Sequence, residues 1–350
     1  MSKMDELIKD TNKKMGEEIM TFGLSDYDYE RIPFTSPYMN YCTFGGVPVG
    51  KITEFYGEEH GGKTTSALDI VANFQALQMQ LDEDKRRKVL YIDAENTLDV
   101  VWAKKLSVSV DDLYILQPKG QSAEQIFQII CDAVETDEVG LWVLDSIGAL
   151  MSQQEWDKTM EDKSYGGVSK PLTMFVKKVE QLMHKHRCTG IGINQLRDKL
   201  NSPIGGTTTT GGWGWKYLCS VRMEFRRGSF VDEDGKEIKR GSENPQGNIV
   251  LMSMTKNKTC PPTRRIGWYT LNYHKGIDYL KDLVDVCLKY DIVDKHGSWF
   301  TIVDIESGEI LVDKLQGKPN VYKALEEDVD VLARIEELVD MKFKEEEDAE

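Results

Sequence analysis

Residues 57–64 read GEEHGGKT, and this stretch decides the fold. It fits the pattern GxxxxGK[ST] and lies between an apolar run, ITEFY at 52–56, and the helix-forming stretch TTSALDIVANFQ at 64–75. That context predicts a strand, a glycine-rich loop and a helix in succession. Glycines let backbone N–H groups turn inward around phosphate oxygens, and the helix that follows presents the positive end of its dipole. We therefore predict a phosphate-binding loop, with a chance glycine-rich turn as the lesser alternative.

The predicted nucleotide contacts extend over this whole loop. Lys63 would reach the outer phosphates, and the hydroxyl of Thr64 would bind Mg²⁺. His60 is expected at the surface of the loop rather than as a side-chain ligand. The residues assigned to nucleotide binding here are Gly57, Glu58, Glu59, His60, Gly61, Gly62, Lys63, Thr64 and Thr65.

Two carboxylates follow apolar runs further along the chain. LWVLDS at 141–146 ends its run at Asp145, as expected of a buried strand that delivers an acidic group beside the loop to hold the metal. Glu95, in YIDAEN at 91–96, closes the strand after the loop's helix, where a carboxylate can orient water. On these residues alone, a helix-capping or ion-paired Glu95 remains the alternative.

Short apolar runs alternate with helical stretches from about 45 to 273, which predicts an α/β fold with a mostly parallel central sheet. LWVL at 141–144 is apolar at every position, as a central parallel strand should be. Later in this region, VRMEFRR at 221–227 and NIVLMSM at 248–254 flank a turn-rich segment. That pair predicts a hairpin-like extension of the sheet.

Shifts in composition divide the chain into four parts. Residues 1–31 form a helix and linker, 32–276 the α/β core, 277–340 a small α+β domain, and 341–350 an acidic tail. A block of like charges cannot bury enough apolar surface to fold, so we expect the tail to be disordered.

The N-terminal part has the pattern of an amphipathic helix. Its apolar residues recur at helical spacing and are Met4, Leu7, Ile8, Met15 and Ile19. Such a helix either packs on its own chain or docks on another copy. The residues themselves leave both possibilities open.

The bulk composition excludes several classes of protein. With 350 residues, 40% hydrophobic and 29% charged, the chain has the balance of a globular protein with a sizeable core. No apolar run approaches the roughly 18 residues of a membrane helix, and the charged start MSKMDELIKDTNKKM lacks the apolar centre of a secretory signal. We therefore expect a cytoplasmic protein. Its six cysteines include no CxxC pair, so we also expect free thiols.

The net charge of −15 argues at first against a nucleic-acid partner, because phosphate binding needs clustered Lys and Arg. The charge is unevenly distributed, however. Residues 326–350 carry twelve acidic and three basic side chains, whereas residues 255–275 carry five basic and no acidic ones. An acidic chain can therefore still have a basic face.

Gln195 ends the apolar run GIGIN and is soon followed by RDKLNSPIGGTTTTGGWGWK at 197–216, which has no periodicity. A long loop of this kind in a compact domain is usually functional or disordered. Its hydroxyls, backbone amides and flanking basic groups suit a loop that follows a nucleic-acid backbone. Trp213 and Trp215 could stack on bases, or one of them could anchor the loop in the core. A plain flexible linker is the alternative.

These motifs, in this order, resemble the bacterial RecA family of DNA strand-exchange recombinases, in a phage-type form. The similarity runs from about 32 to 279 and rests on GGVPVGKITEFYGEEHGGKTTSALDIVA, YIDAENTLDVVWAKKLSV, LWVLDSIGAL, INQLRDKL, TTTTGGWGWKYLCSVRMEFRR and TKNKTCPP. The resemblance implies that Glu95 activates the attacking water and that Asp99 and Trp102 lie against the nucleotide. It also implies that Gln195 couples the γ-phosphate to a DNA-binding loop.

The resemblance further implies two DNA-binding loops, at 155–170 and 196–212, and a subunit interface. In the family, ATP lies between neighbouring subunits of a helical filament. Lys256 and Lys258 match two lysines that reach a neighbour's phosphates, and the N-terminal helix matches an arm that docks on the next subunit. The expected DNA contacts are Lys170, Arg197, Lys199, Thr207, Thr208, Thr209, Gly211 and Gly212, and the expected interface residues are Lys216, Tyr217 and Arg222.

The function implied by the resemblance is homologous recombination that depends on ATP, Mg²⁺ and DNA. Such a protein forms filaments on single-stranded DNA and catalyses pairing and strand exchange with double-stranded DNA. Single-strand-binding and loader proteins are the expected further partners, in the cytoplasm of a bacterial host if the chain is phage-encoded; no membrane partner is expected. The alternative is a relative that switches with ATP as a regulator or assembly protein, without strand exchange, and intact Glu95 and Gln195 argue against it.

Overall fold

The computed structural model describes residues 2–16, 20–21, 29–159, 161–162, 167–198, 206–233, 236–239 and 244–349. The chain divides into two compact units, residues 1–30 and 31–350. Within the described residues, no helix is long and apolar enough to cross a membrane.

The first unit is built on helix α1 (Lys3–Met15). Gly16 ends this helix in the left-handed conformation, with a φ of 75°. No residue of α1 is buried, and its most exposed apolar side chains are Met4, Leu7 and Met15. The predicted amphipathic helix therefore forms, and its apolar stripe is open to solvent within this unit. Ile19, which we also assigned to the stripe, lies outside the described residues.

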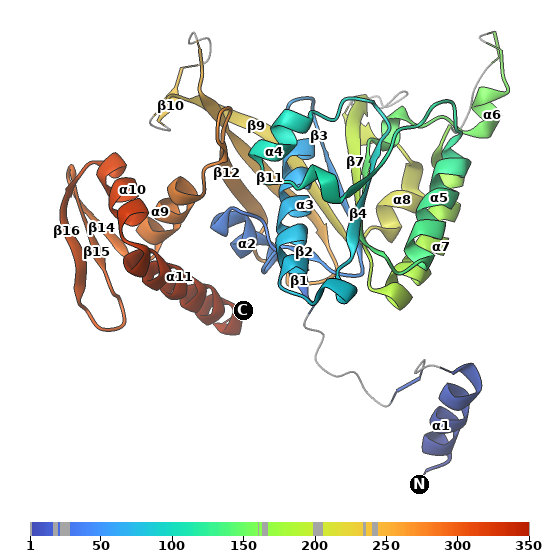
Figure 1. Cartoon of the computed structure of the whole chain (residues 1–350), viewed down its shortest axis with the longest axis horizontal. Helices are drawn as coiled ribbons and strands as arrows, with labels where there is room; N and C mark the ends of the chain where they lie inside the picture. The colour runs from blue at the N-terminus through green and yellow to red at the C-terminus, as the bar shows by residue number, and fades with distance from the viewer. Residues whose placement is uncertain are drawn as a thin grey trace. The chain divides into compact units, whose positions relative to one another are not determined.

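The second unit contains one large sheet, with the strand order β13-β12-β11-β9-β3-β7-β6-β4-β5 (Figure 1). The neighbours from β9 to β5 are parallel, and β11, β12 and β13 extend the sheet by antiparallel pairing. The bounds are β3 (Ile52–Gly57), β4 (Lys88–Asp93), β5 (Leu113–Leu116), β6 (Val139–Asp145), β7 (Thr189–Asp198), β9 (Val221–Val231), β11 (Gly247–Asn257), β12 (Ile266–Asn272) and β13 (Gly276–Ile277). The predicted α/β fold with a mostly parallel sheet is confirmed.

Helices cover both faces of this sheet. In β4, Val89 and Tyr91 enter one hydrophobic cluster and Leu90 and Ile92 the other, because successive side chains of a strand alternate between faces. Residues of α2, α3 and α4 belong to the first cluster, and those of α5, α7 and α8 to the second. The helix bounds are α2 (Pro37–Thr43), α3 (Lys63–Met79), α4 (Val100–Lys105), α5 (Ala123–Glu135), α6 (Gln153–Trp156), α7 (Ser169–His186) and α8 (Gly212–Leu218), with 3-10 turns η1 (Glu83–Lys85), η2 (Val110–Asp112) and η3 (Ile147–Ala149).

Four short strands add local pairing. β1 (Arg31–Ile32) pairs with β2 (Val47–Pro48), and β10 (Glu237–Ile238) folds back on β9 in the predicted hairpin-like extension. β8 (Thr207–Thr209) pairs with the end of β7, and α8 follows it directly. The expectation of a structureless segment from 197 to 216 is therefore wrong for its described residues. The backbone pairing of the threonines with 196–198, and the burial of Trp215 at 0% exposed, supply the order that the glycine-rich sequence concealed.

The small C-terminal domain has its own hydrophobic core. Figure 1 shows its three antiparallel strands beside three helices. The elements are α9 (Tyr279–Lys289), β14 (Val293–His296), β15 (Trp299–Val303), β16 (Ile310–Gln316), α10 (Lys318–Glu327) and α11 (Val329–Ala349). The first of these strands, β14, is short and mostly polar, with the sequence VDKH.

The expectation that residues 341–350 are disordered is also corrected, because 341–349 belong to α11. Glu347 lies 3.4 Å from the buried guanidinium of Arg264, and Glu346 lies 3.7 Å from Lys289. Phe343 packs against Tyr41, with ring centroids 5.0 Å apart. Cations from distant parts of the chain thus compensate the like charges of the tail.

The expectation of free thiols is confirmed for all six cysteines.

Candidate active site

The glycine-rich loop, residues 57–64, joins β3 to α3 as predicted, and we call it the P-loop. At Gly57 a Cβ would lie 2.0 Å from the carbonyl oxygen of Phe225 on the neighbouring strand β9. Gly62, the residue before α3, has a φ of 93°, a conformation that side chains other than glycine rarely adopt. The close turn from strand to helix therefore requires glycine at both positions.

Lys63 is buried within the P-loop, at 8% exposed. Its ammonium donates hydrogen bonds to the carbonyl oxygens of Gly57, at 3.2 Å, and Glu58, at 2.6 Å. Burial lowers the pKa of Lys63, and the nearby carboxylates of Asp145 and Glu95 oppose that shift. The lysine thus spans the loop with its charge held by backbone oxygens, which phosphate oxygens can replace.

Thr64 and Asp145 meet at the carboxyl end of β6. The Thr64 hydroxyl donates to Asp145 Oδ2 at 2.8 Å, and the phenol of Tyr91 donates to the same oxygen at 3.0 Å. Burial raises the pKa of Asp145, and both hydrogen bonds oppose the rise. Adjacent hydroxyl and carboxylate oxygens are the hard ligands that Mg²⁺ prefers. Within the described residues no three His, Cys, Asp or Glu form a metal site, so these oxygens fit an ion that is held partly by nucleotide and water.

Glu95 lies beside Gln195 and is exposed to solvent. Gln195 Nε2 donates a hydrogen bond to Glu95 Oε1 at 3.1 Å. The hydroxyl of Ser146, which directly follows Asp145, donates to the same oxygen. The carboxylate is thus held from β7 and from the turn after β6. Our sequence analysis did not assign Ser146, although it stands in the quoted run LWVLDS.

Asp93 is a second residue that sequence reasoning missed. It is 2% exposed, and its Cα pairs in register with that of Asp145 on the neighbouring strand. Its carboxylate accepts hydrogen bonds from the backbone N–H groups of Thr97 and Leu98, at 2.9 and 3.2 Å, and from Gln117 Nε2 at 3.1 Å. Asp93 therefore shapes the turn that carries Glu95. An aspartate that hydrogen-bonds the backbone after it is a known turn signal.

Asp99 directly precedes α4, and Trp102 lies on that helix, beside the start of α3. Asp99 caps α4 by accepting hydrogen bonds from the N–H groups of Val101 and Trp102, at 2.8 and 3.0 Å. The indole of Trp102 donates to the Thr65 hydroxyl at 3.3 Å. Asp99 thus orients the helix that places Trp102 against the P-loop.

A cavity of about 390 Å³ lies against the P-loop, and residues 60–65 form one of its walls. The opposite wall comes from the antiparallel part of the sheet and consists of Arg227, Asn248, Leu271 and Tyr273. The helix N-terminus and Arg227 give this cavity the positive groups that a polyphosphate requires. Nothing in the sequence links this second wall to the loop, because the pairing of distant strands creates it.

Lys256 and Lys258 lie together at the C-terminal end of α8. Lys256 Nζ donates to the carbonyl oxygens of Lys216 and Tyr217, at 2.8 and 2.7 Å, and Lys258 Nζ donates to that of Tyr217 at 3.1 Å. Burial and the neighbouring Lys258 lower the pKa of Lys256. Neither lysine belongs to the described lining of the cavity beside the P-loop. In the single subunit, both are therefore turned toward α8 and away from its own nucleotide site.

The two predicted DNA loops are described in part. Lys170 is exposed in the first turn of α7, and Arg197 is exposed near the end of β7. Of the hairpin residues, Thr207 is exposed, Thr208 accepts a hydrogen bond from Lys216 Nζ at 2.5 Å, and Thr209 is 5% exposed. Lys199 lies outside the described residues.

The turn into α8 separates the remaining loop residues by burial. Gly211 is buried, and Gly212 is half-buried. Leu172 packs so closely on Gly211 that a Cβ there would lie 2.5 Å from its side chain. Trp213 is 73% exposed and stacks on Tyr217 with ring centroids 5.6 Å apart. Of the two tryptophans, Trp215 is the anchor in the core, and only Trp213 can meet a partner.

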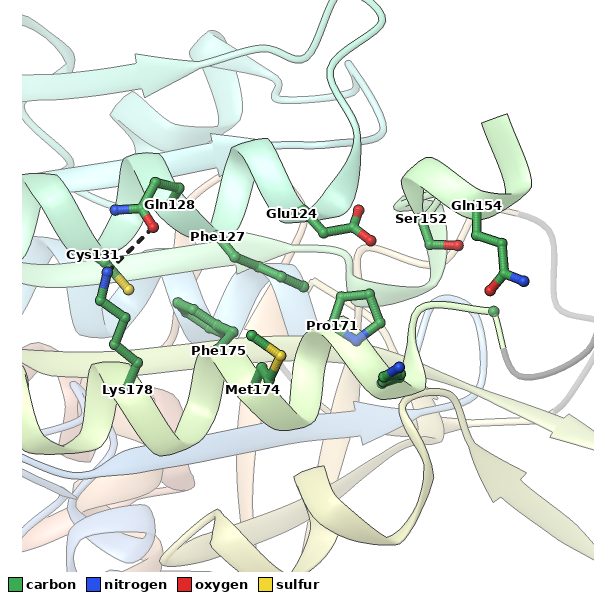
Figure 2. Close-up of a pocket in the computed structure, with 12 residues that line it drawn as sticks. Glu124, Phe127, Gln128, Cys131, Ser152, Gln154, Pro171, Met174, Phe175 and Lys178 are labelled. Atoms are coloured by element: carbon green, nitrogen blue, oxygen red, sulfur yellow. Dashed lines mark hydrogen bonds between the residues drawn. The ribbon is translucent and has the colours of Figure 1, made fainter. Parts of the chain in front are cut away.

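A larger hollow, of about 610 Å³, lies between α5, α6 and α7 (Figure 2). Its floor is the stacked pair Phe127 and Phe175, with centroids 4.5 Å apart, and Met174 lines it from α7. The hollow is mostly apolar and shares no residue with the P-loop. The glycine turn, Lys63 and the N-terminus of α3 converge instead on the smaller cavity, which is therefore the candidate site for a phosphate ligand.

The RecA N-terminal domain family matches residues 2–278, and the RecA C-terminal domain family matches residues 281–344. Similar curated proteins are each named Protein RecA. The one from Fusobacterium nucleatum is 35% identical over 325 residues, covering 92% of this chain and 78% of its own length. The one from a Sulfurovum species is 33% identical over 348 residues, covering 98% and 91%, and one from Clostridium perfringens is 36% identical over 300 residues, covering 85% and 78%.

Proposed function

This chain belongs to the RecA family of recombinases, and we propose that its P-loop cavity binds ATP with Mg²⁺ and couples hydrolysis to single-stranded DNA. As a family member it is a DNA-dependent ATPase that acts in recombination and repair. The observation that carries the proposal is the hydrogen bond from Gln195 to Glu95, because Gln195 lies on the strand that leads into the second DNA loop.

Three side chains would hold the nucleotide. Bound ATP would supply the transferable phosphoryl group, and Mg²⁺ would neutralise its developing charge. Lys63 would exchange the carbonyl oxygens of its own loop for phosphate oxygens and keep its charge paired. The oxygens of Thr64 and Asp145, 2.8 Å apart, would hold the ion on the side of β6.

Glu95 would accept the proton from the attacking water. Its exposure lets a water molecule reach the carboxylate, and Ser146 and Gln195 fix one of its oxygens, so that the other faces the reaction. A general base acts only when it lies within hydrogen-bond reach of the proton that it takes. DNA that displaces β8 from the end of β7 would move Gln195 and thereby reorient Glu95.

The same cavity would be completed by a second copy of the chain. Lys256 and Lys258 are bonded only to weak backbone acceptors at α8 in the contacts described above, and they would add positive charge to a neighbour's nucleotide. The exposed stripe of α1 would dock on that neighbour. Exposed apolar side chains on the edge strand β5 and on α5 offer a surface for it, namely Tyr114, Ile115 and Ile129.

Filaments built in this way would take single-stranded DNA first and double-stranded DNA second, as strand exchange requires. Single-strand-binding and loader proteins remain proposed partners, and we propose a cytoplasmic site of action from the family alone. Membership of the family favours the recombinase over an ATP-switched regulator.

The proposal is tested by D-loop formation between a single-stranded oligonucleotide and supercoiled DNA, with ATP and Mg²⁺. We expect joint molecules with the wild-type chain. Under conditions in which joint molecules form only while ATP is hydrolysed, we expect none with Glu95→Gln. A rate of ATP hydrolysis that does not change when DNA is added, together with no joint molecules, would contradict the proposed function.

A further inference from the structure

Glu54 is a buried acidic residue on β3, with 0% of its surface exposed, and it precedes the P-loop on the same strand. Burying a carboxylate is costly unless its oxygens are paired. Both oxygens are paired here, and the partners come from the strands on either side. Asn194 of β7 donates to Oε1 at 2.9 Å, and Arg222 of β9 donates to Oε2.

Asn194 carries one connection from this carboxylate to the DNA loop. Its side-chain amide, 0% exposed, also donates to the carbonyl oxygen of Thr210 at 2.8 Å, just after β8. Its Oδ1 accepts the backbone N–H of Gln195 at 3.0 Å. One amide therefore fixes both the returning strand of the hairpin and the residue whose side chain holds Glu95.

Arg222 carries the second connection. Its guanidinium donates to the hydroxyl of Thr209 at 3.4 Å and lies 4.6 Å from the ring centroid of Tyr56. Tyr56 directly precedes Gly57, the first glycine of the P-loop. The other oxygen of the carboxylate is therefore linked to the same hairpin and to the strand end beside the nucleotide.

We propose that Glu54 is a positioning residue that couples the β7–β8 hairpin, described at 196–198 and 207–210, to the nucleotide site. One carboxylate on β3 thus anchors both side chains that hold Thr209 and Thr210. The coupling runs in both directions, so bound nucleotide should also raise the affinity for DNA. This inference rests on the proposed DNA-coupled site and adds a residue that touches neither nucleotide nor DNA.

Glu54→Gln tests the proposal, because it keeps the shape of the side chain and presents an amide where Arg222 needs a carboxylate. Thr53→Val is the matched control: Thr53 is also 0% exposed on β3, and its hydroxyl has no hydrogen-bond partner. ATPase rates would be measured with and without single-stranded DNA. DNA affinity would be measured with and without a non-hydrolysable ATP analogue, and thermal midpoints would be recorded in parallel.

For Glu54→Gln we expect nucleotide affinity and DNA-free hydrolysis within about twofold of wild type, and a loss of about tenfold in the stimulation by DNA. The gain in DNA affinity on adding the ATP analogue should shrink by a similar factor. Thr53→Val should keep both the stimulation of hydrolysis by DNA and the gain in DNA affinity with the ATP analogue. A residue with only a structural role would instead lower the thermal midpoint and reduce all activities together.

Stimulation of Glu54→Gln equal to wild type, or a proportional loss with and without DNA, would overturn the proposal. If this variant does not fold, Glu54→Asp keeps the buried charge but is too short to hold both partners, and full stimulation in it would overturn the proposal equally. A wild-type chain without any DNA stimulation would instead contradict the proposed function, so the two failures can be told apart.

Discussion

Ser146→Ala is predicted to slow ATP hydrolysis by loosening Glu95. Ser146 is 1% exposed, and it and Gln195 donate hydrogen bonds to the same oxygen of Glu95. The substitution removes one of these donors and leaves the other, at 3.1 Å. A hydrogen bond to a charged group contributes about 1.5–3 kcal/mol. Since Gln195 still restrains the carboxylate, we take the lower end, which corresponds to a roughly tenfold lower kcat.

The assay is DNA-stimulated hydrolysis over a series of ATP concentrations, with KM expected within about twofold of wild type because Ser146 does not line the nucleotide cavity. Ser122→Ala is the matched control. Ser122 is also buried, at 2% exposed, and caps α5, so its loss should cost about 1 kcal/mol of stability without slowing turnover. A wild-type kcat in Ser146→Ala, beside an inactive Glu95→Gln, would refute the idea that this hydroxyl orients the base.

Three further predictions concern separate parts of the molecule. Lys63→Ala should weaken nucleotide binding and abolish turnover, since it removes the proposed phosphate contact; unchanged hydrolysis would count against the site. Deleting 345–350 removes five carboxylates but keeps Phe343, and it should tighten single-stranded DNA binding at low salt; equal affinity throughout a salt titration would contradict this. Burial raises the pKa of Asp69 to about 6, so the folded state keeps a proton that the unfolded chain releases near pH 4. The stabilising contribution of Asp69 is therefore lost as the pH rises from about 4 to 6, and Asp69→Asn should flatten that decline in a pH series of thermal midpoints, whereas an equally steep decline would argue against it.

The parts of the fold that the sequence predicted are those with local causes. The P-loop is a continuous stretch whose glycines meet specific backbone demands. An apolar run that ends in an acidic residue indicated Asp145, and the acidic stretch just after another such strand, β4, indicated Glu95. Asp93 and Glu54 were missed because their partners depend on strand register, which pairs Asp93 with Asp145 and places Glu54 beside Arg222.

The errors have a common physical origin. The threonine- and glycine-rich hairpin has little intrinsic propensity, and it is ordered by pairing with β7 and by the burial of Trp215. The acidic end of α11 would repel itself if isolated, but it lies against Arg264 and Lys289. In both cases contacts distant in sequence override the local pattern. The second wall of the nucleotide cavity escaped prediction for the same reason.

We propose that hydrolysis takes place at a subunit interface, where Glu95 of one subunit and Lys256 of its neighbour act on one ATP. The direct test mixes two variants, Glu95→Gln and Lys256→Ala, each folded, each able to form filaments on DNA and each inactive alone. In a random equal mixture, about a quarter of the head-to-tail interfaces pair an intact Glu95 with an intact Lys256. We predict recovery of DNA-stimulated hydrolysis to about that fraction of the wild-type rate. No recovery would contradict the claim and would assign Lys256 and Lys258 to DNA contact instead.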